Sequence, residues 1–185
     1  MRVIAGIARS LPLLVPEGKN TRPTTDRIKE TLFNILQSGL CDCVFVDLFS
    51  GSGGVAIEAL SRGAKKAYLV DNDRNAISCI KQNLVFTKLD DSAVVWNKDA
   101  VDAVQQIQEK ADIIFMDPPY GMHIEEELMK ALKNSTCLTK ETMIIIEAEK
   151  HRDFSDIVLM GYELVREKVY KTNKHVFFKI AEEEV

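Results

Sequence analysis

Short apolar runs alternate with amphipathic stretches over most of the chain. Runs rich in β-branched residues predict five strands, at 44–48, 67–70, 93–96, 113–116 and 143–146. Between them, apolar residues at spacings of three and four predict four helices, at 55–62, 74–86, 101–109 and 125–133. An earlier helix is expected after Pro23, because Thr24 or Thr25 can cap it, Asp26 suits a first turn, and Ile28 and Leu32 open an apolar stripe.

This alternation is typical of an α/β fold, a doubly wound, mostly parallel sheet with helices on both faces. The end of the chain differs, because 162–170 and 175–180 look like strands joined by Lys-Thr-Asn-Lys and predict an antiparallel edge hairpin. At the start, β-forming residues broken by Gly6 and Pro12 indicate a short hairpin or an irregular arm. We expect one domain over 1–185, with an arm at 1–20 and a core at 21–185.

Composition narrows the class of protein. A chain of 185 residues with 46% hydrophobic residues can bury a proper core, and no apolar run approaches the roughly 20 residues that span a bilayer. With no signal peptide evident, we expect a cytoplasmic protein with no membrane partner. The cysteines lack metal-ligand spacing, so we expect reduced thiols and no metal: Cys41, Cys43, Cys79 and Cys137. A net charge of −4 argues against a protein that coats nucleic acid, but it allows a local basic patch.

The first candidate motif is Val-Phe-Val-Asp-Leu-Phe-Ser-Gly-Ser-Gly-Gly, which ends a strand at Asp47 and enters a helix through Gly51 and Gly53. The stretch Gly51 to Ala56 also fits the G-x-G-x-x-[GA] fingerprint of dinucleotide sites. However, the Asp47 carboxylate would repel a pyrophosphate, whereas it suits a ligand that carries an ammonium or sulfonium group. A chance glycine-rich loop is the alternative.

Two further acids end the next two predicted strands. Asp71 follows the second strand, about 20 residues on, where an acid accepts hydrogen bonds from ribose hydroxyls. Asp99 follows the third strand and could meet an adenine amino group, although a solvated loop acid is the alternative. Asp73 is expected to cap the following helix.

The fourth strand runs into Asp117, Pro118, Pro119 and Tyr120. The carboxylate of Asp117 and the carbonyl of Pro118 can accept two hydrogen bonds from one amino group, which aims the nitrogen lone pair at an electrophile. The prolines stiffen the loop, and Tyr120 offers a ring on which a base can stack. We therefore predict catalytic roles for these four residues.

Together these motifs resemble class I S-adenosylmethionine-dependent methyltransferases with a D-P-P-Y motif. The block Thr-Arg-Pro-Thr-Thr-Asp-Arg and the closing strands make the whole chain similar to the RsmD family of 16S rRNA guanine-N2 methyltransferases. The resemblance implies a Rossmann-like sheet of about seven strands with an N-terminal hairpin, and S-adenosylmethionine as cofactor. It implies these cofactor-binding residues: Asp47, Phe49, Gly51 and Gly53 at the methionine moiety, Asp71 at the ribose, and Asn72, Asp99, Ala100 and Thr25 nearby.

The resemblance also implies ribosomal RNA as partner, within a small subunit or its precursor. Family members usually carry a basic N-terminal turn, but here Arg9 is the only cation between residues 7 and 14. RNA is therefore either held elsewhere or bound weakly. The candidate RNA-binding residues are Arg2, Arg9, Lys19, Arg22, Arg27, Lys171 and Lys174.

Other functions stay open on the sequence alone. The target amine could be adenine N6 or cytosine N4 in another nucleic acid. A nicotinamide-dependent oxidoreductase would use the glycines at 51–56, but the chain lacks an obvious substrate domain and Asp47 opposes the pyrophosphate. A binding module without activity would not need the sequence from Asp117 to Tyr120.

Overall fold

The computed structural model describes residues 1–16, 25–119 and 124–182. The strands are β1 (Val44–Asp47), β2 (Lys66–Asp71), β3 (Ala93–Asn97), β4 (Ile113–Met116), β5 (Met143–Glu149), β6 (Tyr162–Val169) and β7 (Asn173–Ile180). The α-helices are α1 (Asp26–Leu36), α2 (Gly54–Ser61), α3 (Arg74–Thr87), α4 (Ala100–Gln106), α5 (Ile124–Lys133) and α6 (Ser155–Leu159). No helix in the described part of the chain is long and apolar enough to cross a membrane.

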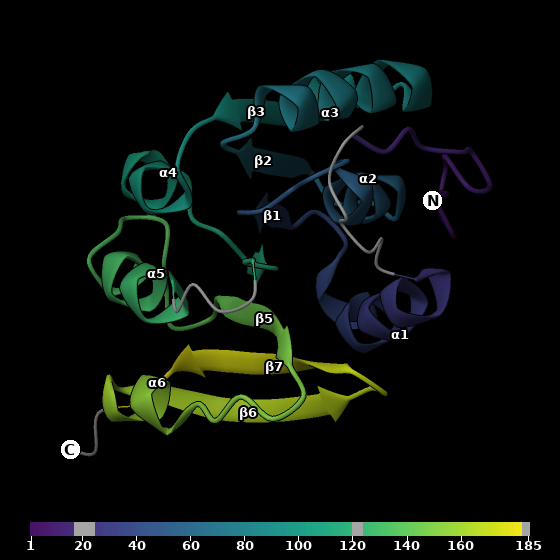
Figure 1. The fold of residues 1–185 in the computed structure, drawn as a ribbon. Helices are drawn as coiled ribbons and strands as arrows, with labels where there is room; N and C mark the ends of the chain where they lie inside the picture. Colours follow the sequence, from purple (N-terminus) through teal and green to yellow (C-terminus); the bar gives the residue numbers. More distant parts are fainter. Residues whose placement is uncertain (17–24, 120–123, 183–185) are drawn as a thin grey trace.

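The strands form one seven-stranded sheet in the order β3-β2-β1-β4-β5-β7-β6 (Figure 1). Strands β1 to β5 pair in parallel, and β7 is antiparallel to both β5 and β6. This confirms the predicted doubly wound sheet with an antiparallel edge hairpin. The chain order changes direction between β1 and β4, where α/β sheets open a crevice for a ligand.

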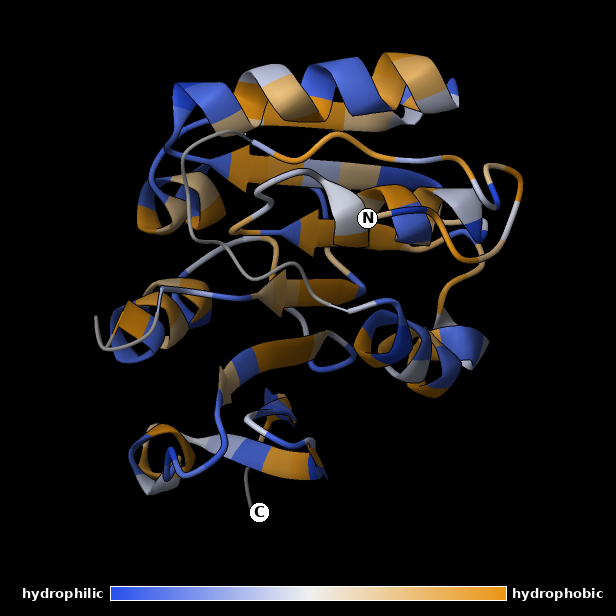
Figure 2. Cartoon of the chain, turned by 45° about the vertical axis from the view of Figure 1, so that its right-hand side comes forward, coloured by the Kyte–Doolittle hydropathy of each residue, from blue (hydrophilic) through white to orange (hydrophobic). Residues whose placement is uncertain are grey.

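Helices cover both faces of the sheet, and the strand side chains alternate between them. Phe45, Leu69 and Phe115 pack on the face that carries α1, α2, α3 and the N-terminal arm. Val46, Val70 and Met116 pack on the other face, against α4 and α5. Figure 2 shows the central strands as mostly hydrophobic, between helices in which hydrophilic and hydrophobic residues are mixed. Two apolar layers thus hold the strand ends in fixed positions.

Helix α1 begins at Asp26, directly after its N-cap residue, Thr25. The Thr25 side chain accepts a hydrogen bond from the Ile28 N–H, and Asp26 lies in the first turn. The N-terminal arm is a short hairpin-like loop, in which the Val3 N–H donates to the Leu11 carbonyl and Arg2 and Pro12 form an antiparallel bridge.

Several element ends differ from the sequence prediction, most by one or two residues, and β7 begins at Asn173, inside the expected turn. The helix expected over 101–109 ends at Gln106, because Ile107 is extended and fully buried. The strand expected over 143–146 continues to Glu149, since β7 pairs with it up to Glu149. Helix α6 has only five residues, too few to show a helical period, and the sequence did not predict it.

Candidate active site

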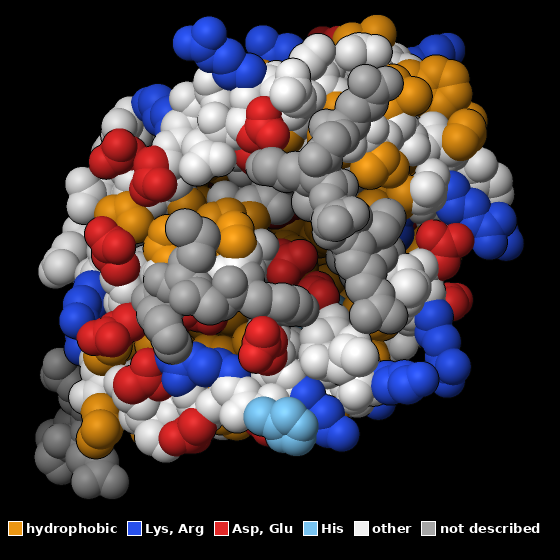
Figure 3. All heavy atoms as spheres, viewed as in Figure 1, with side chains coloured by type: hydrophobic (Ala, Val, Ile, Leu, Met, Phe, Trp, Pro, Cys, Tyr) orange, Lys and Arg blue, Asp and Glu red, His pale blue; other side chains and the backbone are white. Residues whose placement is uncertain are grey.

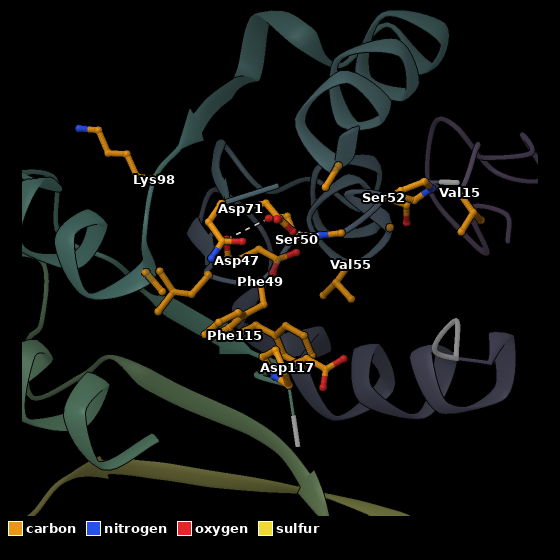
Figure 4. A pocket seen from close by; sticks show the side chains of 18 of the residues that line it. Val15, Asp47, Phe49, Ser50, Ser52, Val55, Asp71, Lys98, Phe115 and Asp117 are labelled. Atoms are coloured by element: carbon orange, nitrogen blue, oxygen red, sulfur yellow. Dashed lines mark hydrogen bonds between the residues drawn. The ribbon is translucent and has the colours of Figure 1, made fainter. Parts of the chain in front are cut away.

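A cavity of about 280 Å³ opens at the carboxyl ends of the central strands. Figure 4 shows Asp47, Ser50 and Asp71 close together in it, with Asp117 beside Phe115. Figure 3 shows the same face hollowed near its centre, where acidic side chains are visible. The predicted site residues that line this cavity are Asp47, Phe49, Gly51, Asp71, Asn72, Asp99, Ala100, Asp117 and Pro119. The structure therefore brings together side chains from four separate strand ends.

The loop after β1 is shaped by two glycines with positive φ. Gly51 has a φ of 55° and Gly53 a φ of 78°, a region that disfavours other residues. A Cβ atom on Gly53 would also come within 3.1 Å of Leu69 Cδ2 and 3.2 Å of Ile57 Cδ1. Gly53 thus packs against the core at the start of α2 rather than lining the cavity, whereas Gly51 and Gly54 are among the residues that line it.

Asp71 fixes this loop from the neighbouring strand. Its Oδ2 accepts a hydrogen bond from the Gly51 N–H at 2.9 Å, and its Oδ1 accepts one from the Asp73 N–H at 2.9 Å. Each carboxylate oxygen has a second lone pair, so both can also accept a hydroxyl from a ligand. Asp73 caps α3 through the Asn75 N–H, as the sequence predicted.

Asp47 is a carboxylic acid buried at the floor of the cavity, with 1% of the residue exposed. Its pKa is raised to about 7, chiefly because burial disfavours the charged form, and also because Asp71 is close. Among the described residues, Oδ1 of Asp47 has no hydrogen-bond partner. A buried acceptor without a partner is costly, so this atom suits a ligand that brings a donor or a positive charge.

Asp99 and Ala100 lie where β3 leads into α4. Asp99 is exposed and caps the helix by accepting a hydrogen bond from the Val101 N–H at 2.8 Å, whereas Ala100 is buried. Phe49 is half-buried and Asn72 is exposed. The capping bond leaves lone pairs of the Asp99 carboxylate for a ligand.

Asp117 and the two prolines follow β4 as predicted. Pro118 is buried and Pro119 is exposed. The pKa of Asp117 is raised well above its usual value by burial first, then by the charges of Glu147 and Asp47. Tyr120 lies outside the described residues, so its expected stacking role stays a prediction.

The sequence did not predict two walls of the cavity. One is Lys29 on α1, which is 1% exposed and whose pKa is lowered by burial. The other is the N-terminal arm, which contributes Met1, Val15 and Pro16. The only sequence signal for Lys29 is a lysine on the same helix face as the apolar Phe33 and Leu36.

Buried polar side chains fix the arm to the core. Glu58 on α2 accepts hydrogen bonds from the Ile4 N–H at 2.8 Å and the Ala5 N–H at 3.0 Å, and its carboxylate lies 3.1 Å from Lys29 Nζ. Asn83 on α3 accepts from the Leu14 N–H at 2.8 Å and donates to the Leu14 carbonyl. The arm is therefore part of the cavity.

A second hollow, the basic groove, lies between α1 and the β6–β7 turn. It has a volume of about 520 Å³ and is lined by Thr25, Arg27, Ile28, Thr31, Lys168, Val169, Tyr170, Lys171, Thr172 and Asn173. Within the described ranges, three cations of this groove form no salt bridge: Arg27, Lys168 and Lys171. Thr25, a predicted cofactor residue, lines this groove instead of the cavity.

The other candidate RNA-binding residues lie in different settings. Arg2 pairs with Asp26 at 2.9 Å, and Lys174 is buried and pairs with Glu167 at 2.6 Å. Arg9 is exposed on the arm. Lys19 and Arg22 lie outside the described residues. In Figure 3, Lys and Arg side chains gather at the lower right, over α1 and the hairpin turn.

The strand order, the cavity at the switch point and the Asp-Pro-Pro sequence after β4 define the class of Rossmann-like methyltransferases. A family model described as "Conserved hypothetical protein 95" matches residues 1–179. The chain is 36% identical to "Ribosomal RNA small subunit methyltransferase D" of Escherichia coli over 91% of this chain and 84% of that protein. The protein of the same name in Haemophilus influenzae is 36% identical, over 91% of this chain and 88% of that protein.

Solved structures agree with the sequence comparison. The Escherichia coli protein yhhF superposes with a TM-score of 0.84 at 33% identity, over 99% of each chain. A hypothetical protein of Thermus thermophilus gives a TM-score of 0.79 at 27% identity, over 96% of this chain and 98% of that chain. The chain belongs to the family of the ribosomal RNA small subunit methyltransferases D.

Proposed function

We propose that this protein transfers a methyl group from S-adenosylmethionine to the exocyclic N2 amine of a guanine in small-subunit ribosomal RNA. The observation that carries the proposal is the convergence of Asp47, Asp71 and Asp117 on one cavity. The relatives from Escherichia coli and Haemophilus influenzae are named for action on small-subunit ribosomal RNA. The choice of guanine N2 follows from the resemblance to their family.

The donor set of the cavity fits S-adenosylmethionine. The partnerless Oδ1 of Asp47 suits the ammonium or sulfonium of the methionine moiety, and a positive charge there would favour the ionised form of this acid. Asp71 suits the ribose hydroxyls, and Asp99 suits an adenine amino group. Gly51 lets the backbone approach this ligand, because no side chain projects from it.

When bound, the cofactor supplies a methyl group activated by a sulfonium. Asp117 and the Pro118 carbonyl then orient the target amine so that its lone pair points at that methyl group. The electron pair of the broken S–C bond stays on sulfur, and the nitrogen loses one proton as its new bond forms. The Asp117 carboxylate is the group placed to take that proton.

We further propose that the RNA lies across the basic groove. Arg27, Lys168 and Lys171 line it and have no carboxylate partner among the described residues, so they are available for phosphates. Arg2 and Lys174 already pair with Asp26 and Glu167. The arm offers Arg9 alone, together with the cations outside the described residues.

Methyl transfer from labelled S-adenosylmethionine to small subunits from a strain without the family enzyme tests the function. Nucleoside mass spectrometry should then show N2-methylguanosine. Methylated adenine or cytosine would overturn the guanine assignment, and no transfer to subunits or to free RNA would overturn the RNA assignment. A thermal-shift comparison of S-adenosylhomocysteine with NAD tests the cofactor, and stabilisation by NAD alone would refute it.

Asp117→Ala should abolish turnover and spare cofactor binding, because its role lies with the target amine. Asp117→Asn should be milder, since the amide oxygen still accepts one hydrogen bond. Calorimetry with S-adenosylhomocysteine controls for the fold of each variant. Wild-type rates in both variants would exclude Asp117 from catalysis.

A further inference from the structure

A buried polar network lies beside Asp117 and takes no part in the mechanism above. It consists of Glu147 on β5, His175 and Asn173 on β7, and Tyr170 in the turn before β7. Glu147 is 5% exposed, Asn173 6% and His175 0%. Buried ionisable groups are rare in apolar cores unless they are hydrogen-bonded and have a role, so this cluster needs an explanation.

Glu147 is held from two sides. Its Oε1 accepts a hydrogen bond from Asn173 Nδ2 at 2.5 Å, and its Oε2 lies 3.0 Å from His175 Nε2. An ionised carboxylate only accepts, so the Asn173 NH2 and the His175 Nε2–H must both donate to it. Asn173 Oδ1 is buried and has no hydrogen-bond partner in the described part of the chain. An unpaired buried acceptor lowers stability, so this arrangement of Asn173 favours the contact with Glu147 over stability.

The ring of His175 is held at both nitrogens. Tyr170 Oη lies 3.1 Å from His175 Nδ1, within hydrogen-bond distance. The pKa of Tyr170 is raised to about 12 by burial first and by Glu147 second, so the phenol keeps its proton. Tyr170 therefore contacts the imidazole at the nitrogen opposite Glu147, which keeps Nε2 of His175 directed at the carboxylate.

Strand register places Glu147 beside Asp117. Strands β4 and β5 are parallel with Met116 opposite Ile146, so the next residues, Asp117 and Glu147, follow side by side on the same face. On the other side of β5, Glu147 is paired with His175. The Phe115 ring meets the His175 ring edge-to-face with centroids 6.0 Å apart, which closes the network under the catalytic loop.

Of the other described charged residues that line the cavity with Asp117, none offsets Glu147. Asp47 on β1 and Asp71 on β2 are acids of the same cavity. Lys29 on α1 also lines it, but its ammonium pairs with Glu58 and donates to the Arg2 carbonyl. Lys98 and Asp99 line the far side, before α4, and Figure 4 shows Lys98 extending away from Asp117.

We propose that Glu147 is a positioning residue for methyl transfer: held by His175 and Asn173, it keeps a fixed negative charge beside Asp117 that strengthens this carboxylate as acceptor of the amine proton. The inference rests on the proposed function of Asp117. In the proton balance, the target nitrogen gains the methyl group and gives one proton to Asp117, while Glu147 neither gains nor loses one.

The test is the single-turnover methylation rate of the whole protein between pH 5 and pH 9. The wild-type rate should rise with pH as Asp117 ionises. Glu147→Gln removes the neighbouring charge, so the midpoint should move to lower pH by about one unit. Glu149→Gln is the matched control, because it makes the same change two residues along β5 at an exposed position, and its midpoint should stay at the wild-type value.

Asn173→Leu is a second variant that keeps the acid. It removes the hydrogen bond from Asn173 to Glu147 Oε1, so the carboxylate is held less firmly beside Asp117. The midpoint should move in the same direction as in Glu147→Gln, but less. This second variant still tests the positioning role of Glu147 if the Glu147→Gln protein does not fold.

The outcomes separate the two proposals. An inactive wild type on every RNA substrate refutes the proposed function itself. An active wild type with an unshifted midpoint in a folded Glu147→Gln or Asn173→Leu variant overturns the positioning role. A shift in these two variants without a shift in Glu149→Gln supports it.

Discussion

Asp47 is one residue at which the proposed function works against stability. Its carboxyl group is fully buried, and its pKa rises from 3.8 to about 7. Between these values the folded protein holds a proton that the unfolded chain has released, so the free energy of unfolding falls as pH rises from about 4 to about 7. Above about pH 7 the free energy of unfolding has lost the whole contribution of Asp47 and no longer changes with pH on its account.

Asp47→Asn should therefore stabilise the protein without cofactor at pH 8. The gain should reach at most about 4 kcal/mol, since each pKa unit is worth about 1.4 kcal/mol. At pH 4 the two proteins should differ little, because Asp47 is protonated in the folded state. Urea unfolding at both pH values measures this, and equal pH dependence of variant and wild type would contradict it. The same variant should bind S-adenosylmethionine more weakly.

At the scale of elements, the sequence was informative where a rule of strand geometry applied. Parallel strands place their carboxyl ends at one edge, so Asp47, Asp71 and Asp117 could be assigned to one site from spacing alone. Lys29 and Glu58 could not be paired, because they meet through the packing of α1 on α2, which no local pattern encodes.

The hydrogen-bond network around Glu147 could not be predicted from the sequence, for a related reason. His175 was predicted only as part of a strand, and its contact with Glu147 depends on the register of the antiparallel β5–β7 pair. Register between strands about 28 residues apart is set by the sheet as a whole. The candidate roles of Tyr120, Lys19 and Arg22 lie outside the described residues and stay predictions.

The contribution of Glu58 to stability can be tested by mutation, because its carboxylate links α2 to the N-terminal arm and to Lys29 on α1. Glu58→Gln leaves Lys29 buried without its carboxylate, and breaking a buried pair costs about 3–5 kcal/mol of unfolding free energy. Lys29→Met combined with Glu58→Gln should recover part of this loss. Chemical denaturation measures both variants.

The matched control is the exposed pair of Glu126 and Lys130 on α5. Glu126→Gln removes the same charge from a surface pair, which is worth about 0.5 kcal/mol or less. Equal losses in Glu126→Gln and Glu58→Gln would mean that the buried pair does not hold the arm.

At the scale of the whole molecule, a chain with a net charge of −4 must place its cations well to bind RNA. The described structure gathers three of them in the basic groove, beside the turn that carries Tyr170. The arm, which the family resemblance would make basic, instead walls the cavity for which we propose the cofactor. The proposed binding of RNA and the proposed binding of cofactor thereby use separate surfaces.

The combined variant Arg27→Ala, Lys168→Ala and Lys171→Ala should weaken RNA binding and flatten its salt dependence. Each lost phosphate contact lowers the slope of log K against log salt by about 0.7 to 0.9, so the three substitutions should together lower it by about 2 to 3 units. Arg9→Ala should change the slope by at most about 1 unit. Filter binding at several salt concentrations measures these slopes.

The control removes the same charge elsewhere. Lys65, Lys110 and Lys140 are exposed and precede β2, β4 and β5, at the amino ends of the strands. Their triple alanine variant should keep the wild-type slope. If instead deletion of residues 2–14 removes most of the slope and the groove variant keeps it, the arm is the RNA anchor.

The place of β7 in the sheet has a consequence for biosynthesis. β7 lies between β5 and β6 although it follows both along the chain. A chain that emerges from its N-terminus therefore exposes the free edge of β5 until residues 173–180 have been made, and such edges invite aggregation. His175 arrives with that strand, opposite Glu147. Translation thus closes the vulnerable edge and completes the network beside Asp117 in the same step.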